Sequence, residues 1–399
     1  MKQIYPNSIT GKGAIQGGSV LDHKFGNSDP FTLGVEEEYM LLDGETFDLV
    51  QHIDTVLRAI TGHELEPRIN AELMQSVLEI ATPVCRNAGD VQRELLKLRA
   101  YVTEVARTKG LRVGSAGTHP FSLFERQRIT ARDRYRNLVD QLQYIARREL
   151  IFGMHVHVAV DDPEKAIQVL NGLLPQLGPL LALSASSPFW RGEPTGLSSS
   201  RQMVFAAFPR SGPPPRFRDY ADYAEVVGQL ERTGCIADYT HIWWDIRLHP
   251  RLGTIEIRIC DAITRVEDAV ALAAYCQALV KLLSEQHDRG EQIPSFHRIL
   301  TTENKWLAAR YGLEAPVMDL ATGARNRMPI AQLVRRTLKE IQPHARELGS
   351  ERELEGIGEI LGRGNGADRQ LRVFNANRDI VEVVEEIAKA TEAVPAPAA

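Results

Sequence analysis

Two strands in direct succession constrain the fold of this chain more than any other feature of its sequence. Residues 243–249 and 254–261 each alternate as a strand does, and the turn Pro250-Arg251-Leu252-Gly253 joins them. So short a turn joins only antiparallel neighbours, because parallel strands need a crossover of about a dozen residues or more. The hairpin predicts an antiparallel or mixed sheet, and with the helices around it the α+β class rather than a doubly wound parallel sheet.

The remaining elements alternate irregularly. The helix at 90–109 has the clearest pattern, since its apolar residues fall on one stripe and Gly110 follows as a stop signal. We expect the other strands at 33–42, 77–81, 111–115 and 151–160, and the other helices at 132–150, 163–174, 265–286, 330–341 and 379–391.

The domain organisation is simple. Residues 30–391 contain no long linker and no internal repeat, which predicts a single domain. Residues 1–29 are polar and glycine-rich, and we expect a flexible leader there. Residues 392–399 end in alanine and proline, and we expect a disordered tail.

Composition excludes several kinds of partner. The formal net charge of -5, without blocks of like charge, argues against a dedicated nucleic-acid binder. No run approaches the roughly 18 apolar residues of a membrane span. The four cysteines form no C-x-x-C pair, which predicts a reducing, cytoplasmic location. We therefore expect small-molecule partners, and neither nucleic acid nor a membrane.

Four predicted strand segments carry an unusual set of polar side chains. Successive strand residues point to opposite faces, so residues two apart share a face. One such strand alone usually has a solvated outer face, and two histidines in His-x-His often simply pack. Together, however, these faces carry no lysine. The residues are Glu36 with Glu38, Glu79, His155 with His157, and Glu256 with Arg258.

Crowded carboxylates repel one another and are costly to desolvate unless a cation lies among them. Oxygen ligands with one or two imidazoles suit Mg²⁺ or Mn²⁺, whereas zinc recruits more histidine or cysteine. Arg258, two residues from Glu256, would stabilise a phosphoryl group in transfer. The pattern predicts a phosphoryl-transfer site. No phosphate-binding loop occurs, so if ATP binds here, metals and side chains must hold its phosphates.

Four motifs in this order resemble those of the carboxylate–amine ligase family, also called glutamate–cysteine ligase type 2. That family belongs to the glutamine synthetase and glutamate–cysteine ligase superfamily. The similar segments extend from about residue 31 to about residue 387. The motifs are GVEEEY at 34–39, ELM at 72–74 with VLEIATP at 77–83, GMHVHV at 153–158 and TIEIR at 254–258.

The resemblance implies a curved, mainly antiparallel sheet that cradles ATP and Mg²⁺, with helices packed on its outer face. Residues 30–391 would be the catalytic domain of an ATP-dependent ligase that forms an amide bond through an acyl phosphate. Glutamate and cysteine are the implied substrates, although another amine stays open, and a homodimer is implied as well.

The resemblance also assigns roles to residues. Glu256 and Arg258 would be catalytic, with Arg258 on the transferred phosphate. Glu72 and Glu79 are seven apart, so both reach one face only with a turn or bulge between them. The implied metal ligands are Glu36, Glu38, Glu72, Glu79, His155 and Glu256.

Basic residues in similar segments are candidates for binding substrate or nucleotide. They are Arg201, Lys305 and Arg310, each with an ordinary solvated charge as the alternative. His157 either orients a ligand or packs. Two other functions stay open at this point: a zinc hydrolase using the His-x-His strand, and a non-catalytic module that senses a nucleotide or metabolite.

Overall fold

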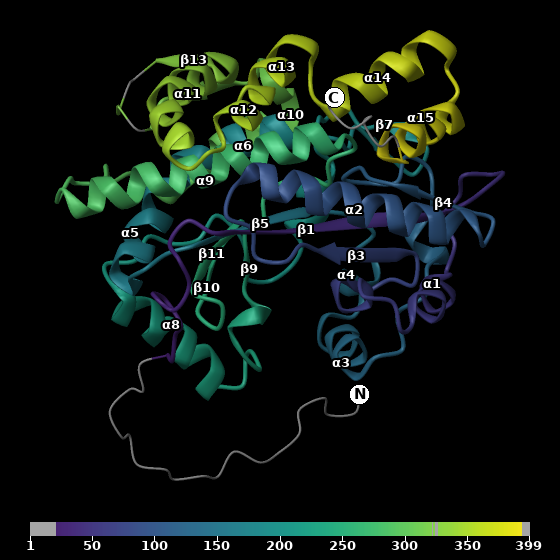
Figure 1. Ribbon diagram of the computed structural model, residues 1–399, viewed down its shortest axis with the longest axis horizontal. Coiled ribbons are helices and arrows are strands. Elements are labelled where there is room, and N and C mark those ends of the chain that lie inside the picture. The colour runs from purple at the N-terminus through teal and green to yellow at the C-terminus, as the bar shows by residue number, and fades with distance from the viewer. Residues whose placement is uncertain (1–20, 321, 324–325, 393–399) are drawn as a thin grey trace, which may run out of the picture.

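The computed structural model describes residues 21–320, 322–323 and 326–392. Its centre is a seven-stranded, open and wholly antiparallel sheet in the order β10-β11-β5-β1-β3-β2, with β4 paired to the far end of β1 (Figure 1). The predicted α+β class is therefore confirmed. The strands are β1 (Leu33–Asp43), β2 (Ile69–Ala71), β3 (Val77–Ala81), β4 (Leu111–Gly114), β5 (Met154–Ala159), β10 (Ile246–His249) and β11 (Thr254–Ile257).

Helices cover one face of this sheet. Figure 1 shows α2 (Ala88–Arg107) and α9 (Val266–Asp288) lying across it, with the C-terminal helices beyond them. The apolar stripe expected on α2 is buried, and the Asn87 side chain accepts a hydrogen bond from the Asp90 N–H at the start of the helix. Val35, Tyr39 and Leu41 of β1 face these helices and are buried in the main core.

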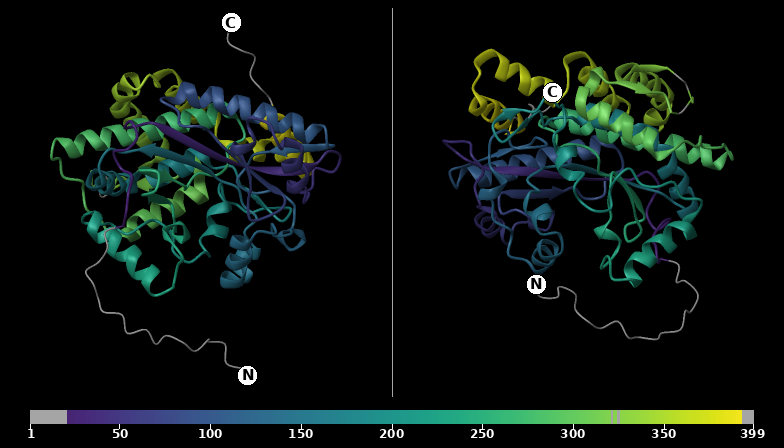
Figure 2. Two further views of the ribbon diagram at one scale, coloured as in Figure 1. Left: turned by 60° about the horizontal axis from the view of Figure 1, so that its bottom comes forward. Right: turned by 180° about the vertical axis from the view of Figure 1, so that it is seen from behind.

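The other helices lie on both sides of the sheet (Figure 2). Helices α10 to α13 lie on the side of α2 and α9, whereas α3, α4 and α8 lie on the opposite side. Helices α14 and α15 lie at the β4 end of the sheet, where α15 packs against Met40 and Leu42, on the face of β1 opposite to Tyr39 and Leu41. The remaining helices are α1 (Ile53–Ile60), α3 (Asp133–Leu142), α4 (Tyr144–Arg147), α5 (Pro163–Leu173), α6 (Leu177–Ser184), α7 (Arg201–Phe205), α8 (Tyr220–Arg232), α10 (Arg298–Tyr311), α11 (Ile330–Glu347), α12 (Glu351–Leu354), α13 (Gly356–Arg363), α14 (Gly366–Asn377) and α15 (Ile380–Glu392). Three two-stranded ladders join β6 (Phe189–Trp190) to β7 (Glu193–Pro194), β8 (Ser211–Gly212) to β9 (Trp243–Trp244), and β12 (Pro316–Met318) to β13 (Arg327–Pro329).

Two expected elements are broken, and both breaks lie near the polar face of the sheet. The helix expected over 132–150 divides at Gln143, whose φ of 51° is incompatible with a helix, and its end becomes a turn before β5. The strand expected over 243–249 divides into β9 and β10 at Asp245. Periodicity cannot detect such breaks, because the apolar pattern continues through them.

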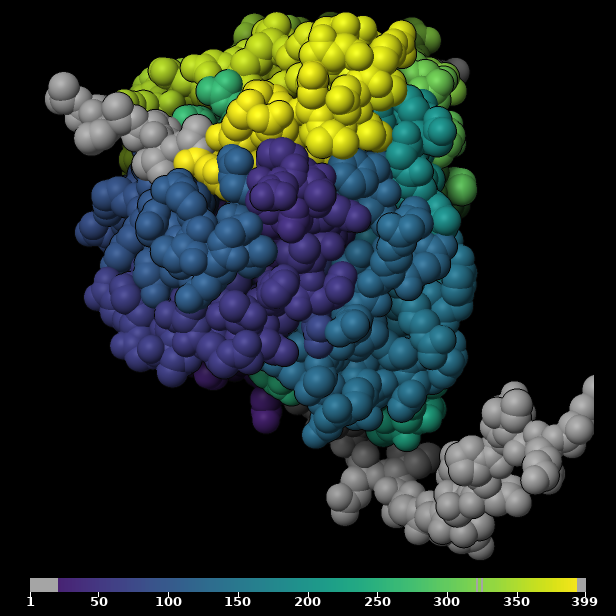
Figure 3. Space-filling view, turned by 90° about the vertical axis from the view of Figure 1, so that its right-hand side faces the viewer, coloured from purple at the N-terminus to yellow at the C-terminus, as the bar shows by residue number. Residues whose placement is uncertain are grey.

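The two ends of the described chain pack onto the fold. Phe25, in the segment expected as leader, is buried, and the Lys24 N–H donates to the Pro250 carbonyl at 2.9 Å. Helix α15 packs on β4, where Arg112 and Glu392 form an ion pair of 2.7 Å. Figure 3 shows the C-terminal helices resting directly on the N-terminal part of the chain. Residues 1–20 of the expected leader and 393–399 of the expected tail lie outside the described residues.

One segment is more apolar than we expected from the sequence. Pro163–Ser184 has the length and hydropathy of a membrane span, with a mean hydropathy of 1.4 over 18 residues. However, 83% of that window is buried inside the fold, where α5 and α6 pack on α9 and α10. Its apolar character is therefore that of a core helix pair. The four cysteines are free thiols, and of these only Cys235 is exposed.

The middle glutamate of β1 has a structural partner. Arg99 of α2 donates to both carboxylate oxygens of Glu37, at 2.5 and 3.0 Å, and both side chains are buried. Arg99 also donates to the carbonyls of Ile263 and Thr264, which lie between β11 and α9. This clamp joins β1, α2 and the loop before α9, so it fixes the strand whose other face carries Glu36 and Glu38.

Replacing Arg99 by methionine should lower the free energy of unfolding by about 3–5 kcal/mol, because it leaves the buried Glu37 carboxylate without its cation. Urea denaturation measures this loss. The double variant Glu37→Gln/Arg99→Met should recover part of it, because the buried charge is then gone. A single variant as stable as the wild type would contradict a structural role for the clamp.

Candidate active site

The register of the sheet brings the polar side chains of distant segments to one face, opposite the face that α2 and α9 cover. Residues directly opposite each other on adjacent strands share a face. Four such pairs carry ionisable groups on both strands. They are Glu36 with His155, Glu38 with Glu79, His157 with Glu256, and Arg247 with Glu256.

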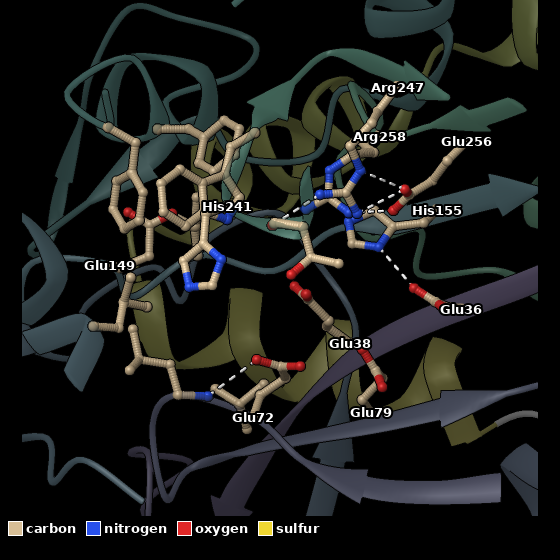
Figure 4. A pocket seen from close by; sticks show the side chains of 18 of the residues that line it. Glu36, Glu38, Glu72, Glu79, Glu149, His155, His241, Arg247, Glu256 and Arg258 are labelled. Carbon is tan, nitrogen blue, oxygen red and sulfur yellow. Dashed lines mark hydrogen bonds and ion pairs between the residues drawn. The ribbon is translucent and has the colours of Figure 1, made fainter. Parts of the chain in front are cut away.

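A cavity of about 340 Å³ opens on this face (Figure 4). The residues expected to form the site divide into two groups. Lys305 and Arg310 do not line the cavity. Those that do are Glu36, Glu38, Glu72, Glu79, His155, His157, Arg201, Glu256 and Arg258.

At one end of the cavity, three ligand atoms converge. These atoms are one carboxylate oxygen of Glu36, one carboxylate oxygen of Glu256 and one ring nitrogen of His157, and they lie within 4.8 Å of one another. His157 Nε2 is 3.5 Å from Glu36 Oε1 and 3.9 Å from Glu256 Oε1, and it is buried without a hydrogen-bond partner among the described residues. His155, the expected ligand, hydrogen-bonds with Glu36 through Nδ1 at 2.9 Å. Either imidazole could join the two carboxylates around a cation.

Two arginines hold Glu256. Arg247 donates to its Oε2 through Nε at 2.8 Å and places Nη2 2.7 Å from the same oxygen, and Arg258 donates to its Oε1. Burial acts to raise the pKa of Glu256, but Arg247 and Arg258 together hold the pKa well below its usual range. Arg258 Nε is buried without a partner among the described residues, so the guanidinium keeps a free donor. This end of the cavity combines carboxylates with donors suited to phosphate oxygens.

A second group of carboxylates lies beside the first. Glu72 belongs to the turn between β2 and β3, which explains how it reaches the same face as Glu79 despite their odd spacing. Burial first, and then the charge of Glu72, raises the pKa of Glu38 to about 7. Burial and the neighbouring carboxylates raise the pKa of Glu79 well above its usual value. A bound cation would relieve the repulsion among the carboxylates of Glu38, Glu72 and Glu79.

Arg201 enters the cavity from the first turn of α7. It is buried, donates to the Ile259 carbonyl at 3.2 Å, and lies 3.9 Å from Asp261. Asp261 in turn accepts hydrogen bonds from the hydroxyls of Ser187 and Ser199 at 2.7 and 2.9 Å. The Ile259 carbonyl and Asp261 therefore hold the Arg201 guanidinium in place, so that it is a preorganised cation.

Gly153 leaves the space that Arg201 occupies. A Cβ at this position would lie 2.5 Å from Arg201 Nη2. Gly153→Ala should displace the guanidinium and lower kcat/KM by up to about 10², the cost typical of a misplaced positioning group. Gly358→Ala is the matched control, because a Cβ there meets nothing within 4 Å. Steady-state kinetics checks this, and unchanged kcat/KM in Gly153→Ala would contradict it.

The two basic residues outside the cavity have structural partners. Lys305 donates to both oxygens of Asp245 at 2.7 and 2.8 Å, at the break between β9 and β10. The Asp245 carbonyl accepts from the Arg258 N–H at 2.8 Å, so Lys305 supports Arg258 from a distance. Arg310 is exposed, donates to the Gly196 carbonyl and lies over the Tyr311 ring.

The cavity also contains residues that the sequence did not single out. Arg247 was detectable, because alternation places it opposite Glu256 in the hairpin. His249 was detectable in the same way, because it lies two residues after Arg247 on β10. The others come from helix ends, connections and the short strand β9, where the strand expected over 243–249 is broken. They include Arg134, Tyr135, Glu149, Phe205, Phe208, His241 and Trp243.

Known proteins resemble this chain along most of its length. Residues 32–389 match the model of "Glutamate-cysteine ligase family 2(GCS2)". A Rubrobacter xylanophilus protein named "Putative glutamate--cysteine ligase 2-1" is 43% identical over 371 residues, which are 93% of this chain and 97% of that protein. A Sorangium cellulosum protein with the corresponding name is 43% identical over 358 residues, or 90% of this chain and 95% of that one.

Solved structures share the fold. The glutamate–cysteine ligase of Francisella tularensis, in complex with AMP, superposes with a TM-score of 0.65 at 13% identity, covering 92% of this chain and 90% of that one. A bifunctional glutathione synthetase from Pasteurella multocida gives a TM-score of 0.65 at 16% identity, covering 90% of this chain and 52% of that one.

Sheet, site and relatives together define an ATP-dependent carbon–nitrogen ligase, an enzyme that joins a carboxylate to an amine. The chain belongs to the glutamate–cysteine ligase family 2. This membership favours a ligase over a zinc hydrolase or a non-catalytic sensing module.

Proposed function

We propose that the enzyme joins the γ-carboxylate of glutamate to the amino group of cysteine and converts ATP to ADP and phosphate. The names of its relatives suggest these two substrates. The observation that carries the proposal is the register that gathers Glu36, His155, His157, Glu256 and Arg258 on one sheet face. Each strand contributes part of this set, so the chemistry depends on the assembled sheet.

A carboxylate is a poor electrophile, and phosphorylation is the proposed solution. A carboxylate oxygen attacks the γ-phosphorus of ATP, and the bond from that phosphorus to ADP breaks. The amine then attacks the carbonyl carbon of the acyl phosphate, and phosphate leaves with the electron pair of the broken C–O bond. The residues serve chiefly to position the groups and to stabilise charge.

The donors of the cavity fit these charges. Arg258, held by Glu256, directs its guanidinium to the phosphoryl group in transfer, and Arg247 adds a second positive charge beside it. Arg201 is the preorganised partner for a substrate carboxylate. These assignments give two cations to the phosphoryl group and one to a substrate carboxylate.

The donor set also fits divalent cations. Glu36, Glu256 and one of the two histidines would hold one ion, and Glu38, Glu72 and Glu79 would hold a second. The unpartnered His157 Nε2 supports this fit, because a buried nitrogen without a hydrogen bond to the described residues suits a metal ligand. Oxygen-rich ligands favour Mg²⁺ or Mn²⁺. When bound, such ions would neutralise the phosphates of ATP.

The test is ADP and phosphate release from ATP and Mg²⁺ with glutamate plus cysteine, alongside a panel of other acids and amines. We expect amine-dependent release and an amide product detected by mass spectrometry. Release with a different acid or amine would retain the ligase and replace the substrates. No amine-dependent release across the panel would contradict the proposal.

A further inference from the structure

One acidic side chain of the cavity stands apart from the two carboxylate groups. Glu149 lies in the turn between α4 and β5, after the helical segment ends at Arg147, and lines the cavity. Figure 4 shows it on the side of the cavity away from Glu36 and Glu256. Its position off the sheet separates it from the residues proposed to hold cations.

Glu149 also differs from Glu36, Glu38 and Glu256 in its partners. Glu36 hydrogen-bonds with His155, Glu38 accepts from the Gly153 N–H at 2.6 Å, and Glu256 is held by two arginines. Glu149 Oε2 is buried and accepts no hydrogen bond from the described residues. A buried carboxylate oxygen without a donor is costly, so its retention at a cavity wall points to a donor that arrives with a ligand.

The surroundings of Glu149 favour a group that exchanges a proton. Burial raises the pKa of Glu149 to about 8, and among the charged groups around it Arg201 and Arg148 oppose this rise while Glu38 adds to it. A base works best when its pKa lies near the operating pH. The amine substrate of a ligase supplies both a cation and a proton, because a primary amine enters as ammonium and cannot attack in that form.

We propose that Glu149 binds the ammonium group of the amine substrate and takes one of its protons. This rests on the proposed function. One N–H bond breaks, the proton passes to a Glu149 carboxylate oxygen, and the freed nitrogen lone pair forms the C–N bond. The C–O bond to phosphate then breaks, and phosphate leaves with that electron pair and a second proton from nitrogen. Charge and hydrogen balance, because one proton stays on the amide.

The test compares two nucleophiles in Glu149→Gln, which keeps the shape of the side chain and removes the proton acceptor. Cysteine needs deprotonation, whereas hydroxylamine is already a free base at neutral pH and reports acyl-phosphate formation as a hydroxamate. We expect the variant to lose about 10²–10⁴ of the cysteine-dependent rate, the range for general-base catalysis. Hydroxamate formation should stay close to wild type, which also shows that the variant folds.

Glu125→Gln is the matched control, because Glu125 is a half-exposed carboxylate paired with Arg191 and does not line the cavity. Equal rates for wild type and Glu149→Gln with cysteine would overturn the inference. Equal losses with both nucleophiles would also overturn it, because they indicate a merely structural role. A wild-type enzyme without activity on either nucleophile would instead contradict the proposed function.

Discussion

Replacing Arg258 by glutamine should lower kcat by about 10²–10³, the usual cost of removing one preorganised charged donor from a transition state. Arg258 follows β11 directly, and its backbone N–H is fixed by the Asp245 carbonyl at 2.8 Å. Its guanidinium donates to Glu256, and its Nε has no partner among the described residues. The Arg258 side chain therefore lines the cavity and keeps one N–H donor, at Nε, that no described residue accepts.

The variant should remain folded. Glu256 keeps Arg247 as its partner at 2.7 Å, so no buried carboxylate is left without a cation. ADP release under saturating substrates measures kcat, and thermal unfolding checks the fold. Arg265→Gln is a control, since Arg265 is 40% exposed and pairs with Glu267 at 3.6 Å, outside the cavity. An unchanged kcat in Arg258→Gln would remove Arg258 from the reaction.

Glu36→Gln should weaken the binding of Mn²⁺ by at least about 10–100-fold, because even loss of a group that only supports a metal ligand costs this much. Glu36 contacts His155 and His157 on β5 and lies close to Glu256 on β11. It is therefore a ligand of the proposed ion at this end of the cavity, whichever histidine completes the set. The change removes one negative charge and keeps the size of the side chain.

Titration of Mn²⁺ by electron paramagnetic resonance measures this affinity without relying on turnover. Activity should fall in parallel and recover in part when the Mn²⁺ concentration is raised. Glu45→Gln is the control, because Glu45 is exposed in the turn that follows the same strand. Equal Mn²⁺ affinity in wild type and Glu36→Gln would exclude Glu36 as a ligand.

Much of the sheet and its polar face follow from the sequence, because both depend on alternation. The two-residue period of a strand is enough to assign Glu36, Glu38, His155, His157 and Glu256 to their faces. The hairpin register extends the same reasoning to Arg247, which lies opposite Glu256. Glu72 needed a turn, and the connection between β2 and β3 supplies one.

The rest depends on segments without a repeating pattern. Glu149 lines the cavity because the helical segment is broken at Gln143 and ends at Arg147, before the expected end at residue 150, and no apolar period signals these changes. Lys305 lies in a segment that resembles the family, yet its place outside the cavity is set by its pairing with Asp245. Local sequence indicates the charge of these residues but not the side chains that they meet in the folded chain.

The central claim is that divalent ions and ATP bind on the acidic face of the sheet. A crystal structure with Mn²⁺ and a non-hydrolysable ATP analogue, with Mn²⁺ located by its anomalous signal, tests it most directly. We predict Mn²⁺ bound by Glu36 and Glu256 together with His155 or His157, and the terminal phosphate beside Arg258. Mn²⁺ and nucleotide bound elsewhere, with these side chains uncoordinated, would contradict the account.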